Sequence, residues 1–313
     1  MLTFESDRFR DVELHLPTGH FYRGRSVGGE ETCHQFPGLD LCFDIGYAPM
    51  SATSISRVFI THGHADHAGG MARHATRRHG RKLAPATYYV PECITAGTQA
   101  LFDAMMMLEG SPRSGKIIAV EAKPENPYAP ADSKRDPFKP NPDHVRVLTE
   151  DRSLTAFPAK HRIPCFGYLV SQTRKRLRSD LKGASQEQIK ALARSGENLN
   201  EYVIVPDIAY CGDTLIDVLK EQPDVRQARL LILECTMLEG SVSVEDTRRA
   251  GHIHLDEIIN EPELLAENEC VLLTHFSARY RTQEIRDILD RRLPDSLKEK
   301  IIPLLPSSRA PVV

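Results

Sequence analysis

The segment 61–70, Thr-His-Gly-His-Ala-Asp-His-Ala-Gly-Gly, constrains this chain more than any other stretch. It places three histidines and an aspartate within six positions, directly after the apolar run Val-Phe-Ile. Positions two apart on a helix point to nearly opposite sides, so His62 and His64 can converge only in a loop at a strand end. Imidazole and carboxylate are ligands of zinc and similar metals, and Asp66 and His67 can serve a second ion. The segment therefore predicts a metal-binding loop rather than a histidine-rich surface loop.

Two ions need more ligands than this loop supplies, so further ligands are expected at later strand ends. His161, Asp213 and His275 each follow a strand-like apolar run. Side chains at strand-to-loop junctions can reach a shared site. Taken singly, each is more typical of an ordinary loop histidine or a helix-capping aspartate. All three follow the first four ligands in the sequence, each at the end of a strand-like run, and this shared placement favours a common metal site.

Strand-like and helix-like segments alternate along the whole chain. With 313 residues and 41% hydrophobic content, the chain can bury one large core or two modest ones. Strands are expected over 10–16, 39–45, 57–61, 87–90, 116–120, 145–149, 153–159, 166–171, 202–205, 208–211, 230–233 and 271–274, and helices over 69–80, 91–108, 185–192, 214–221, 255–267 and 282–292. This order predicts a single α/β domain, a sheet sandwich with helices outside.

The cysteines and the apolar segments indicate a cytoplasmic protein. No apolar run approaches the roughly 20 residues that span a bilayer, and residues 1–7 lack the features of a secretory signal. The seven cysteines are scattered and never form a CxxC pair. Buried free thiols in a reducing compartment are the expected state, rather than disulfides or a thiolate metal site.

Basic residues are concentrated in one segment, although the chain as a whole has a net charge of −3. Residues 171–195 hold seven basic side chains against Asp180 and Glu187, a local net charge of +5. The seven are Arg174, Lys175, Arg176, Arg178, Lys182, Lys190 and Arg194. A second basic stretch, 73–82, directly follows the metal loop. Such patches suit a polyanion, and the alternative is a solvated helix face.

Several motifs spread over the chain resemble one enzyme family. They are Ser26–Cys33, Phe43–Gly46, the HxHxDH loop, His161 with Gly167-Tyr168, Gly212–Thr214, Ser241–Glu245, Gly251–His254 and Leu273–Tyr280. HxHxDH is typical of the metallo-β-lactamase superfamily, and the whole set resembles ribonuclease Z (tRNase Z) in its short plant-type form. The resemblance implies a metallo-β-lactamase-type αββα sandwich and an endoribonuclease that removes 3′ trailers from precursor tRNA.

The resemblance also implies roles for individual residues. One zinc ion is assigned to His62, His64 and His161, a second to Asp66, His67 and His275, and Asp213 bridges both. Mn²⁺ and Fe²⁺ are alternative ions. The metals would lower the pKa of a bridging water from 15.7 to around 7.

Two further residues receive catalytic roles from the same resemblance. Asp66 would orient or deprotonate the attacking water, and His252 would donate a proton to the leaving 3′ oxygen. His254 is interpreted as structural. Family members are commonly homodimers, so a homodimer is expected.

The basic segment is predicted to be an insertion that binds RNA. The domain spans 1–313, with a basic arm-like insertion at about 171–200 and a proline-rich loop at about 110–143. Because relatives place a tRNA-gripping arm here, RNA-binding residues are predicted at Arg174, Lys175, Arg176, Arg178 and Lys182.

Two alternatives stay open at this stage. The same site could hydrolyse a small phosphodiester, a cyclic nucleotide or a lactone, because the fold permits each of these. The chain could also be a nucleic-acid-binding protein with an inactive site. His252 and the basic segment favour a phosphodiester over a lactone, because an alkoxide leaving group benefits from an acid.

Overall fold

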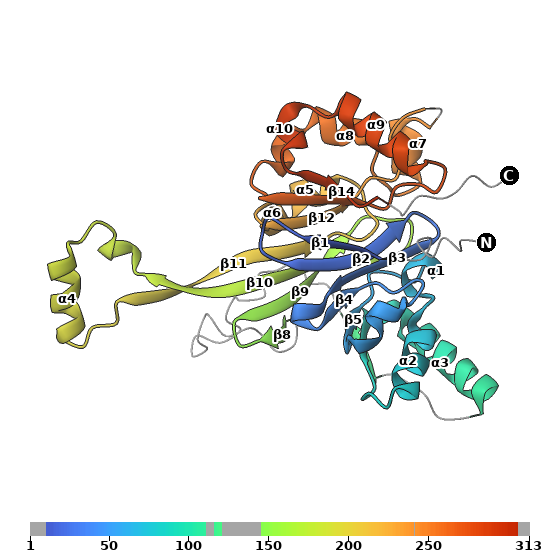
Figure 1. Cartoon of the computed structure of the whole chain (residues 1–313), viewed down its shortest axis with the longest axis horizontal. Helices are drawn as coiled ribbons and strands as arrows, with labels where there is room; N and C mark the ends of the chain where they lie inside the picture. The colour runs from blue at the N-terminus through green and yellow to red at the C-terminus, as the bar shows by residue number, and fades with distance from the viewer. Residues whose placement is uncertain (1–10, 111–115, 121–144, 241, 306–313) are drawn as a thin grey trace, which may run out of the picture.

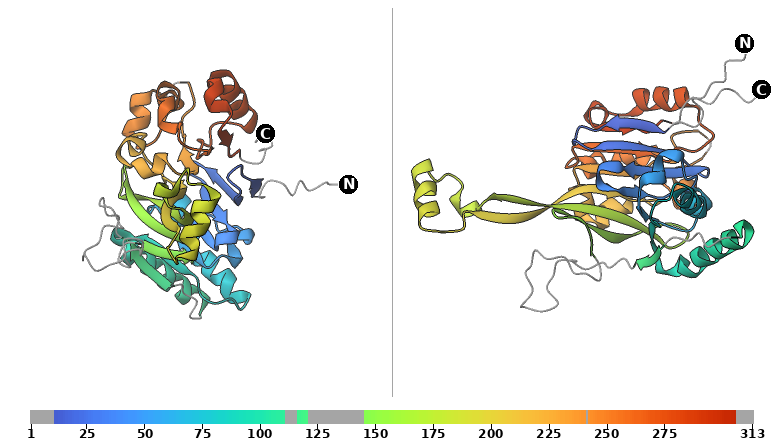
Figure 2. Two further views of the ribbon diagram at one scale, coloured as in Figure 1. Left: turned by 90° about the vertical axis from the view of Figure 1, so that its left-hand side faces the viewer. Right: turned by 60° about the horizontal axis from the view of Figure 1, so that its bottom comes forward.

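The computed structural model describes residues 11–110, 116–120, 145–240 and 242–305. Two seven-stranded sheets lie face to face, with helices outside each of them (Figures 1 and 2). This is the α/β sandwich that the alternation of segments predicted. The expected proline-rich loop falls almost wholly outside the described residues, apart from the strand 116–120.

The first sheet takes its strands from the N-terminal part of the chain. Its order is β1 (Val12–His15), β2 (Phe21–Val27), β3 (Glu31–Phe36), β4 (Leu41–Phe43), β5 (Arg57–Phe59), β6 (Thr87–Pro91) and β7 (Lys116–Val120). Neighbours are antiparallel from β1 to β4 and parallel from β4 to β7. The carboxyl ends of β4 and β5 therefore meet at one edge, where the metal loop begins.

The second sheet mirrors this arrangement. Its order is β14 (Ile301–Pro303), β13 (Cys270–Thr274), β12 (Leu230–Glu234), β11 (Asn200–Tyr210), β10 (Cys165–Leu177), β9 (Arg152–Ala159) and β8 (Val145–Thr149). Strands β11 to β14 are parallel neighbours, so the loops after β11, β12 and β13 emerge at the same edge.

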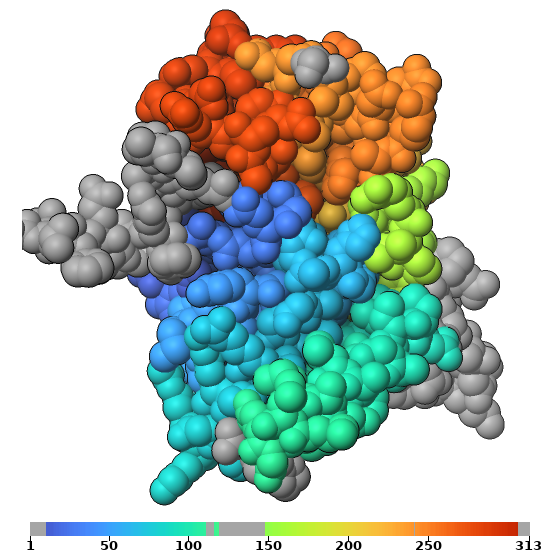
Figure 3. Space-filling model, turned by 90° about the vertical axis from the view of Figure 1, so that its right-hand side faces the viewer, coloured from blue at the N-terminus to red at the C-terminus, as the bar shows by residue number. Residues whose placement is uncertain are grey.

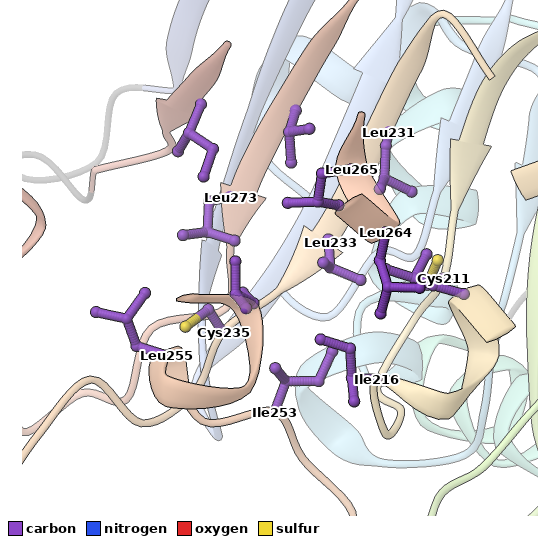
Figure 4. Close-up of a cluster of buried hydrophobic side chains, with 14 of the residues drawn as sticks. Cys211, Ile216, Leu231, Leu233, Cys235, Ile253, Leu255, Leu264, Leu265 and Leu273 are labelled. Carbon is purple, nitrogen blue, oxygen red and sulfur yellow. The ribbon is translucent and has the colours of Figure 1, made fainter. Parts of the chain in front are cut away.

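Aromatic side chains fill the space between the sheets. Phe43 of β4 stacks on Tyr168 of β10 with ring centroids 5.9 Å apart, and lies 5.3 Å from Tyr210 of β11. A second apolar layer lies between the second sheet and its helices, where Leu231 and Leu233 of β12 face Leu264 (Figure 4). Four layers thus enclose apolar cores on both faces of each sheet.

Ten α-helices are described: α1 (Ala65–Ala68), α2 (Met71–Gly80), α3 (Thr95–Glu109), α4 (Gln186–Arg194), α5 (Asp217–Glu221), α6 (Pro223–Arg226), α7 (Val244–Arg249), α8 (Leu255–Asn260), α9 (Thr282–Arg292) and α10 (Asp295–Lys298). Three sequence-based helix boundaries were wrong. The helix expected over 214–221 begins only at Asp217. Pro91 does not begin a helix, because it ends β6 paired with Val120. The helix expected over 255–267 ends at Asn260, because Pro262 cannot continue it and starts a 3₁₀ turn.

The arm (residues 172–205) also departs from the expected boundaries. Strand β10 does not end at Ser171 but continues to Leu177, paired in register with β11. A register shift lies between Val170 and Ser171, and β9 pairs with β10 only as far as Gln172. Beyond that point β10 and β11 form a two-stranded ribbon that carries α4 at its tip, away from the sandwich (Figure 1). Side chains polar on both faces hid this strand, because alternation was the signal sought.

Within the described residues, no helix has the length and apolar character needed to cross a bilayer.

Candidate metal centre and catalytic site

The metal loop is held by a close approach of two backbone segments. Strand β5 is followed by the loop that carries His62 and His64, and α1 carries Asp66 and His67. A side chain on Gly46 would collide with the backbone of Asp66, so glycine is needed here. The loop thus lies against the end of β4.

A first group of ligand atoms comes from four side chains. The Nε2 atom of His62 and the Nε2 atom of His161 lie 3.0 and 3.3 Å from Nδ1 of His64. Oδ2 of Asp213 lies 3.7 Å from Nε2 of His62. All four ligand atoms fall within 4.8 Å of one another, a spacing that a single metal ion can bridge.

A second group lies beside the first. Nε2 of His67 and Nε2 of His275 are 3.3 Å apart, and Oδ2 of Asp66 is 3.5 Å from each. Oδ1 of Asp213 lies 3.3 and 3.4 Å from the same two nitrogens. Asp213 therefore directs one carboxylate oxygen toward each group.

Asp44 orients one histidine of each group. Its carboxylate accepts a hydrogen bond from Nδ1 of His67 at 2.8 Å. It also accepts the hydroxyl of Thr61 at 2.9 Å, and that hydroxyl oxygen lies 2.9 Å from Nδ1 of His62. These bonds fix the tautomer that leaves Nε2 of both rings free to bind a metal.

Two further histidines are oriented from the second sheet. Nδ1 of His161 donates to the carbonyl of Gly251 at 2.8 Å, and Nδ1 of His275 lies 3.0 Å from the hydroxyl of Thr236. In both rings Nε2 again faces the shared site. Outer partners of this kind are typical of metal ligands.

The electrostatics of the centre fit divalent cations. Burial lowers the pKa of His62, His64 and His161, which favours the neutral imidazole that binds metals. Among the described residues, histidines are the only ion-pair partners of the buried carboxylates of Asp44, Asp66 and Asp213. Oδ1 of Asp213 is buried without a hydrogen-bond partner. Nitrogen and oxygen donors, with a buried carboxylate oxygen that accepts no hydrogen bond, suit zinc or a similar ion.

His252 lies at the edge of this centre. Its ring stacks on His275 with centroids 5.6 Å apart and lies 5.0 Å from the ring of His161. Nδ1 is 2.9 Å from the buried carboxylate of Glu234. Burial would lower the pKa of His252, but Glu234 outweighs burial and raises this pKa to about 9. Glu234 therefore favours the charged form of the His252 imidazole, and Nε2 is the ring nitrogen that Glu234 does not engage.

The spacing also admits His252 as a ligand together with Asp213 and His275. However, Nδ1 is the atom nearest Asp213, at 4.0 Å, and it is already engaged by Glu234. This hydrogen bond favours a role for His252 as a general acid over a role as a metal ligand.

Comparison with known proteins gives the family. The chain is 34% identical over 288 residues to tRNase Z TRZ1 of Arabidopsis thaliana, a match that covers 91% of this chain and 95% of that protein. The chain belongs to the ribonuclease Z family. It is 31% identical to the chloroplastic tRNase Z TRZ2 of the same plant, over 92% of this chain and 75% of that protein. No protein-family profile matches.

A solved structure agrees on the fold. The metallo-β-lactamase fold protein YhfI from Bacillus subtilis superimposes with a TM-score of 0.55 at 16% identity, covering 91% of this chain and 95% of that protein. The ribonuclease Z family member described here is thus an enzyme, a hydrolase of the metallo-β-lactamase fold.

All eight candidate ligand and acid residues of this ribonuclease Z lie together. His62, His64, Asp66, His67, His161, Asp213, His252 and His275 share one site at the edge of the sandwich. His254 is confirmed as structural, because its ring accepts a hydrogen bond from the Asp256 amide and caps α8.

Sequence reasoning missed the outer partners Asp44, Glu234 and Thr236. Asp44 stood in a segment used for the resemblance, but no role was predicted for it. Glu234 ends the apolar run Leu230–Leu233, and a lone carboxylate after a buried strand was the available signal.

The five predicted RNA-binding residues lie away from the centre. Cys165, the first residue of β10, lies 3.7 Å from His62 through its sulfur. Arg174 is nine positions further on, about 30 Å along an extended strand. Arg174, Lys175 and Arg176 are exposed on the ribbon, and Arg178 and Lys182 follow it.

Proposed function

We propose that this chain is a zinc-dependent endoribonuclease that removes 3′ trailers from precursor tRNA. One observation carries the proposal: in a ribonuclease Z family member, seven ligand side chains and an acid converge on one site. A protein that only bound nucleic acid, with an inactive site, would not need all eight of these side chains. Relatives named tRNase Z support tRNA as the substrate.

The ligands divide between two zinc ions. His62, His64 and His161 would hold one ion, and Asp66, His67 and His275 the other. Asp213, with an oxygen toward each group, would hold both. Bound zinc supplies an activated water and polarises the scissile phosphate, and Mn²⁺ or Fe²⁺ could supply the same chemistry.

Two residues move protons in this proposal. Asp66 orients or deprotonates the attacking water, and the amide of Gly29 donates a hydrogen bond to Oδ2 of Asp66 at 2.9 Å. His252 gives its Nε2 proton to the leaving 3′ oxygen as the phosphorus–oxygen bond breaks. Glu234 stabilises the charged imidazole that makes this transfer possible.

The arm favours RNA over a small phosphodiester, a cyclic nucleotide or a lactone. Arg174, Lys175 and Arg176 lie on an exposed ribbon, and Tyr202 stands opposite Lys175 in the β10–β11 register. Cationic side chains beside an exposed aromatic ring suit an RNA backbone. A small substrate would need only the metal centre.

The assembly and compartment are part of the same proposal. We expect a homodimer, and the exposed Met107 and Leu108, with fractional exposures of 84% and 81% at the end of α3, offer apolar surface for it. We also expect the cytoplasm, because all seven cysteines are free and six of them are buried.

The test is incubation of the purified protein with a 3′-extended precursor tRNA, followed by mapping of both product ends. We expect one cut that leaves a 3′ hydroxyl on the tRNA, and close to two zinc-class ions per chain. Asp213→Asn should lose both ions and the activity, because one carboxylate serves both groups. Asp224→Asn, an exposed aspartate, is the matched control.

Other outcomes would select an alternative. An intact precursor together with hydrolysis of bis(p-nitrophenyl) phosphate or a cyclic nucleotide would favour a small-substrate hydrolase. A metal content near zero, in protein purified without chelators, would favour the inactive-site alternative.

A further inference from the structure

Three arginines follow one face of α2 at intervals of four residues. Arg73, Arg77 and Arg81 form this α2 arginine stripe, and α2 contains no acidic residue. Like charges four apart on a helix destabilise it. Burial and then the neighbouring Arg73 and Arg81 lower the pKa of Arg77, the expected effect of crowded cations. An arrangement that costs stability in this way suggests an anionic partner.

The helix itself does not explain the first arginine of the stripe. Arg73 lies in the first turn of α2, where the helix dipole disfavours a cation. Among the described residues, neither Arg73 nor Arg81 forms an ion pair with a carboxylate, and both are exposed. Arg77 donates to the carbonyl of Ala48 and is thereby fixed in place. No carboxylate of the described residues thus neutralises either of these two guanidinium groups.

An aromatic ring lies beside the stripe. The Arg73 guanidinium sits over the ring of Tyr47, 5.4 Å from its centroid, and Tyr47 is 38% exposed. Tyr47, Met50 and Arg77 line a cleft of about 590 Å³. Guanidinium groups next to an aromatic ring form the kind of surface that binds single-stranded nucleic acid, with phosphates on the cations and a base on the ring.

The carboxylates in the same cleft are already engaged. Asp11 accepts hydrogen bonds from Ser51 and Gln35, and Glu13 pairs with Arg23. Asp11 keeps its charge in these neutral hydrogen bonds, but among the described residues neither carboxylate forms an ion pair with an arginine of the stripe.

The stripe begins directly beside the metal loop. Helix α2 follows α1 after Gly69 and Gly70, and a side chain on Gly70 would collide with the backbone of Ile45 and Ala48. The segment that carries Tyr47 is thus packed on the start of α2. From there α2 extends for about 15 Å. Figure 3 shows this side of the molecule. The N-terminal segments (blue and cyan) lie there beside the segments around residue 160 (yellow-green) and residue 250 (orange).

The arm lies at the opposite end of the sandwich. In Figure 1 it projects to the left, whereas α1, α2 and α3 lie to the right. If the arm contacts the tRNA body, the strand beyond the scissile phosphate is free to follow α2.

We propose that the α2 arginine stripe and Tyr47 bind the RNA 3′ trailer as a single strand. Arg73 and Arg81 contact trailer phosphates, and Tyr47 stacks on one base. This inference rests on the proposed function and adds to it a second RNA surface, separate from the arm and from the metal ligands.

The test compares precursors with a trailer of about 12 nucleotides and with a single-nucleotide trailer. The double variant Arg73→Gln/Arg81→Gln should raise KM for the long-trailer precursor roughly tenfold and leave KM for the short one unchanged. Two lost phosphate contacts should reduce the slope of log Kd against log salt by about 1.4 for a labelled single-stranded oligoribonucleotide. Arg286→Gln/Lys298→Gln on α9 and α10, with the same charge change, is the control.

Tyr47 is tested separately. Tyr47→Leu should weaken binding of the oligoribonucleotide by roughly 5- to 100-fold, the usual effect of one stacked base, and Tyr47→Phe should restore it. Hydrolysis of bis(p-nitrophenyl) phosphate should stay unchanged in every variant, which shows that the centre is intact.

The inference would be overturned if the double variant had the same KM as the wild type for the long-trailer precursor. Cleavage of that precursor would still support the proposed function. If no precursor is cut, the proposed function fails, and the trailer assignment fails with it even if the oligoribonucleotide binds. A change in sedimentation of Arg73→Gln/Arg81→Gln, with RNA binding unchanged, would assign the stripe to a contact between copies and overturn the inference.

Discussion

The partner of its Nδ1 atom separates His252 from His161 and His275, although His67 also has a carboxylate partner, Asp44. Nδ1 of His161 faces a carbonyl and Nδ1 of His275 a hydroxyl, whereas Nδ1 of His252 faces the carboxylate of Glu234. A carboxylate stabilises the charged imidazole. His67 has such a partner within a ligand group, whereas His252 lies beside the two ligand groups, where the proposed function makes it the proton donor. Glu234 is therefore a positioning residue for the proposed acid.

We predict that His252→Ala lowers kcat on precursor tRNA by roughly 10²–10⁴, the usual range for a general acid, with the metal content retained. Glu234→Gln should lower kcat by a smaller factor, because the imidazole keeps its place but loses its charged partner. The measurement is single-turnover cleavage together with metal analysis. His254→Asn, which keeps the cap of α8, is the control and should cleave normally. Loss of metal from His252→Ala would make His252 a ligand instead.

The arm shows how one element depends on another for its shape. After the register shift at Val170/Ser171, β10 leaves β9 and pairs with β11 alone. A two-stranded ribbon is marginal by itself, so its ends need support. The sheet supports one end, and α4, which has a capping box at Ser185 and Gln188, closes the other. The arm therefore holds its cations far from the centre without taking part in the core.

Within the arm, the cations without ion-pair partners should contribute most to RNA binding. Arg176 pairs with Glu201 and Arg178 with Asp180, whereas Arg174 and Lys175 form no ion pair among the described residues. We predict that Arg174→Gln/Lys175→Gln raises KM for precursor tRNA and flattens its salt dependence more than Arg176→Gln/Arg178→Gln does. The measurement is steady-state cleavage across a salt series.

Hydrolysis of bis(p-nitrophenyl) phosphate in the same preparations is the control, and it should hardly change. Equal loss on both substrates would make the arm a structural part of the active site. No loss on either would make these cations a solvated surface.

At the scale of the whole molecule, Asp207 joins the two sheets. It is fully buried in β11, yet it contacts Nε2 of His20, which precedes β2, at 3.1 Å. Arg152 of β9 and Arg229 before β12 each lie 3.3 Å from its carboxylate. Burial would raise the pKa of Asp207, but His20 and Arg152 outweigh burial and hold this pKa below its ordinary value.

We predict that Asp207→Asn lowers the free energy of unfolding by about 2 kcal/mol at neutral pH, because charged hydrogen bonds to a buried carboxylate are lost, although Arg152 keeps Asp151 and Arg229 keeps Glu269. A carboxyl with a lowered pKa stabilises the fold above its unfolded pKa of about 3.9, and this contribution is lost as the pH falls through the folded value. The difference between wild type and variant should therefore be constant from about pH 7 to 5 and shrink below about pH 4.

Urea unfolding of both proteins in chelator measures this difference without a contribution from metal loss. Asp224→Asn, at an exposed position, is the control and should change little. A difference that persists undiminished in acid would show that Asp207 acts through packing rather than charge.

The sequence by itself determined the features that depend on near neighbours. The apolar run before His62 and the spacing of the next three ligands specify a strand and a loop, because both are set within about ten residues. The helix over 185–192 was predicted for the same reason, and α4 spans Gln186–Arg194. The later ligands were found because each follows a buried strand, and parallel strand ends meet at one edge of a sheet.

Only the tertiary structure decided which side chains support this site. Asp44 reaches His67 across 23 positions, and Glu234 reaches His252 only once the chain folds back after β12. Nothing local in the sequence separates such carboxylates from those on the surface, because their partners are distant in the chain. The ribbon beyond Ser171 was missed for a related reason: its backbone hydrogen bonds hold it together, and these leave no hydrophobic pattern in the sequence.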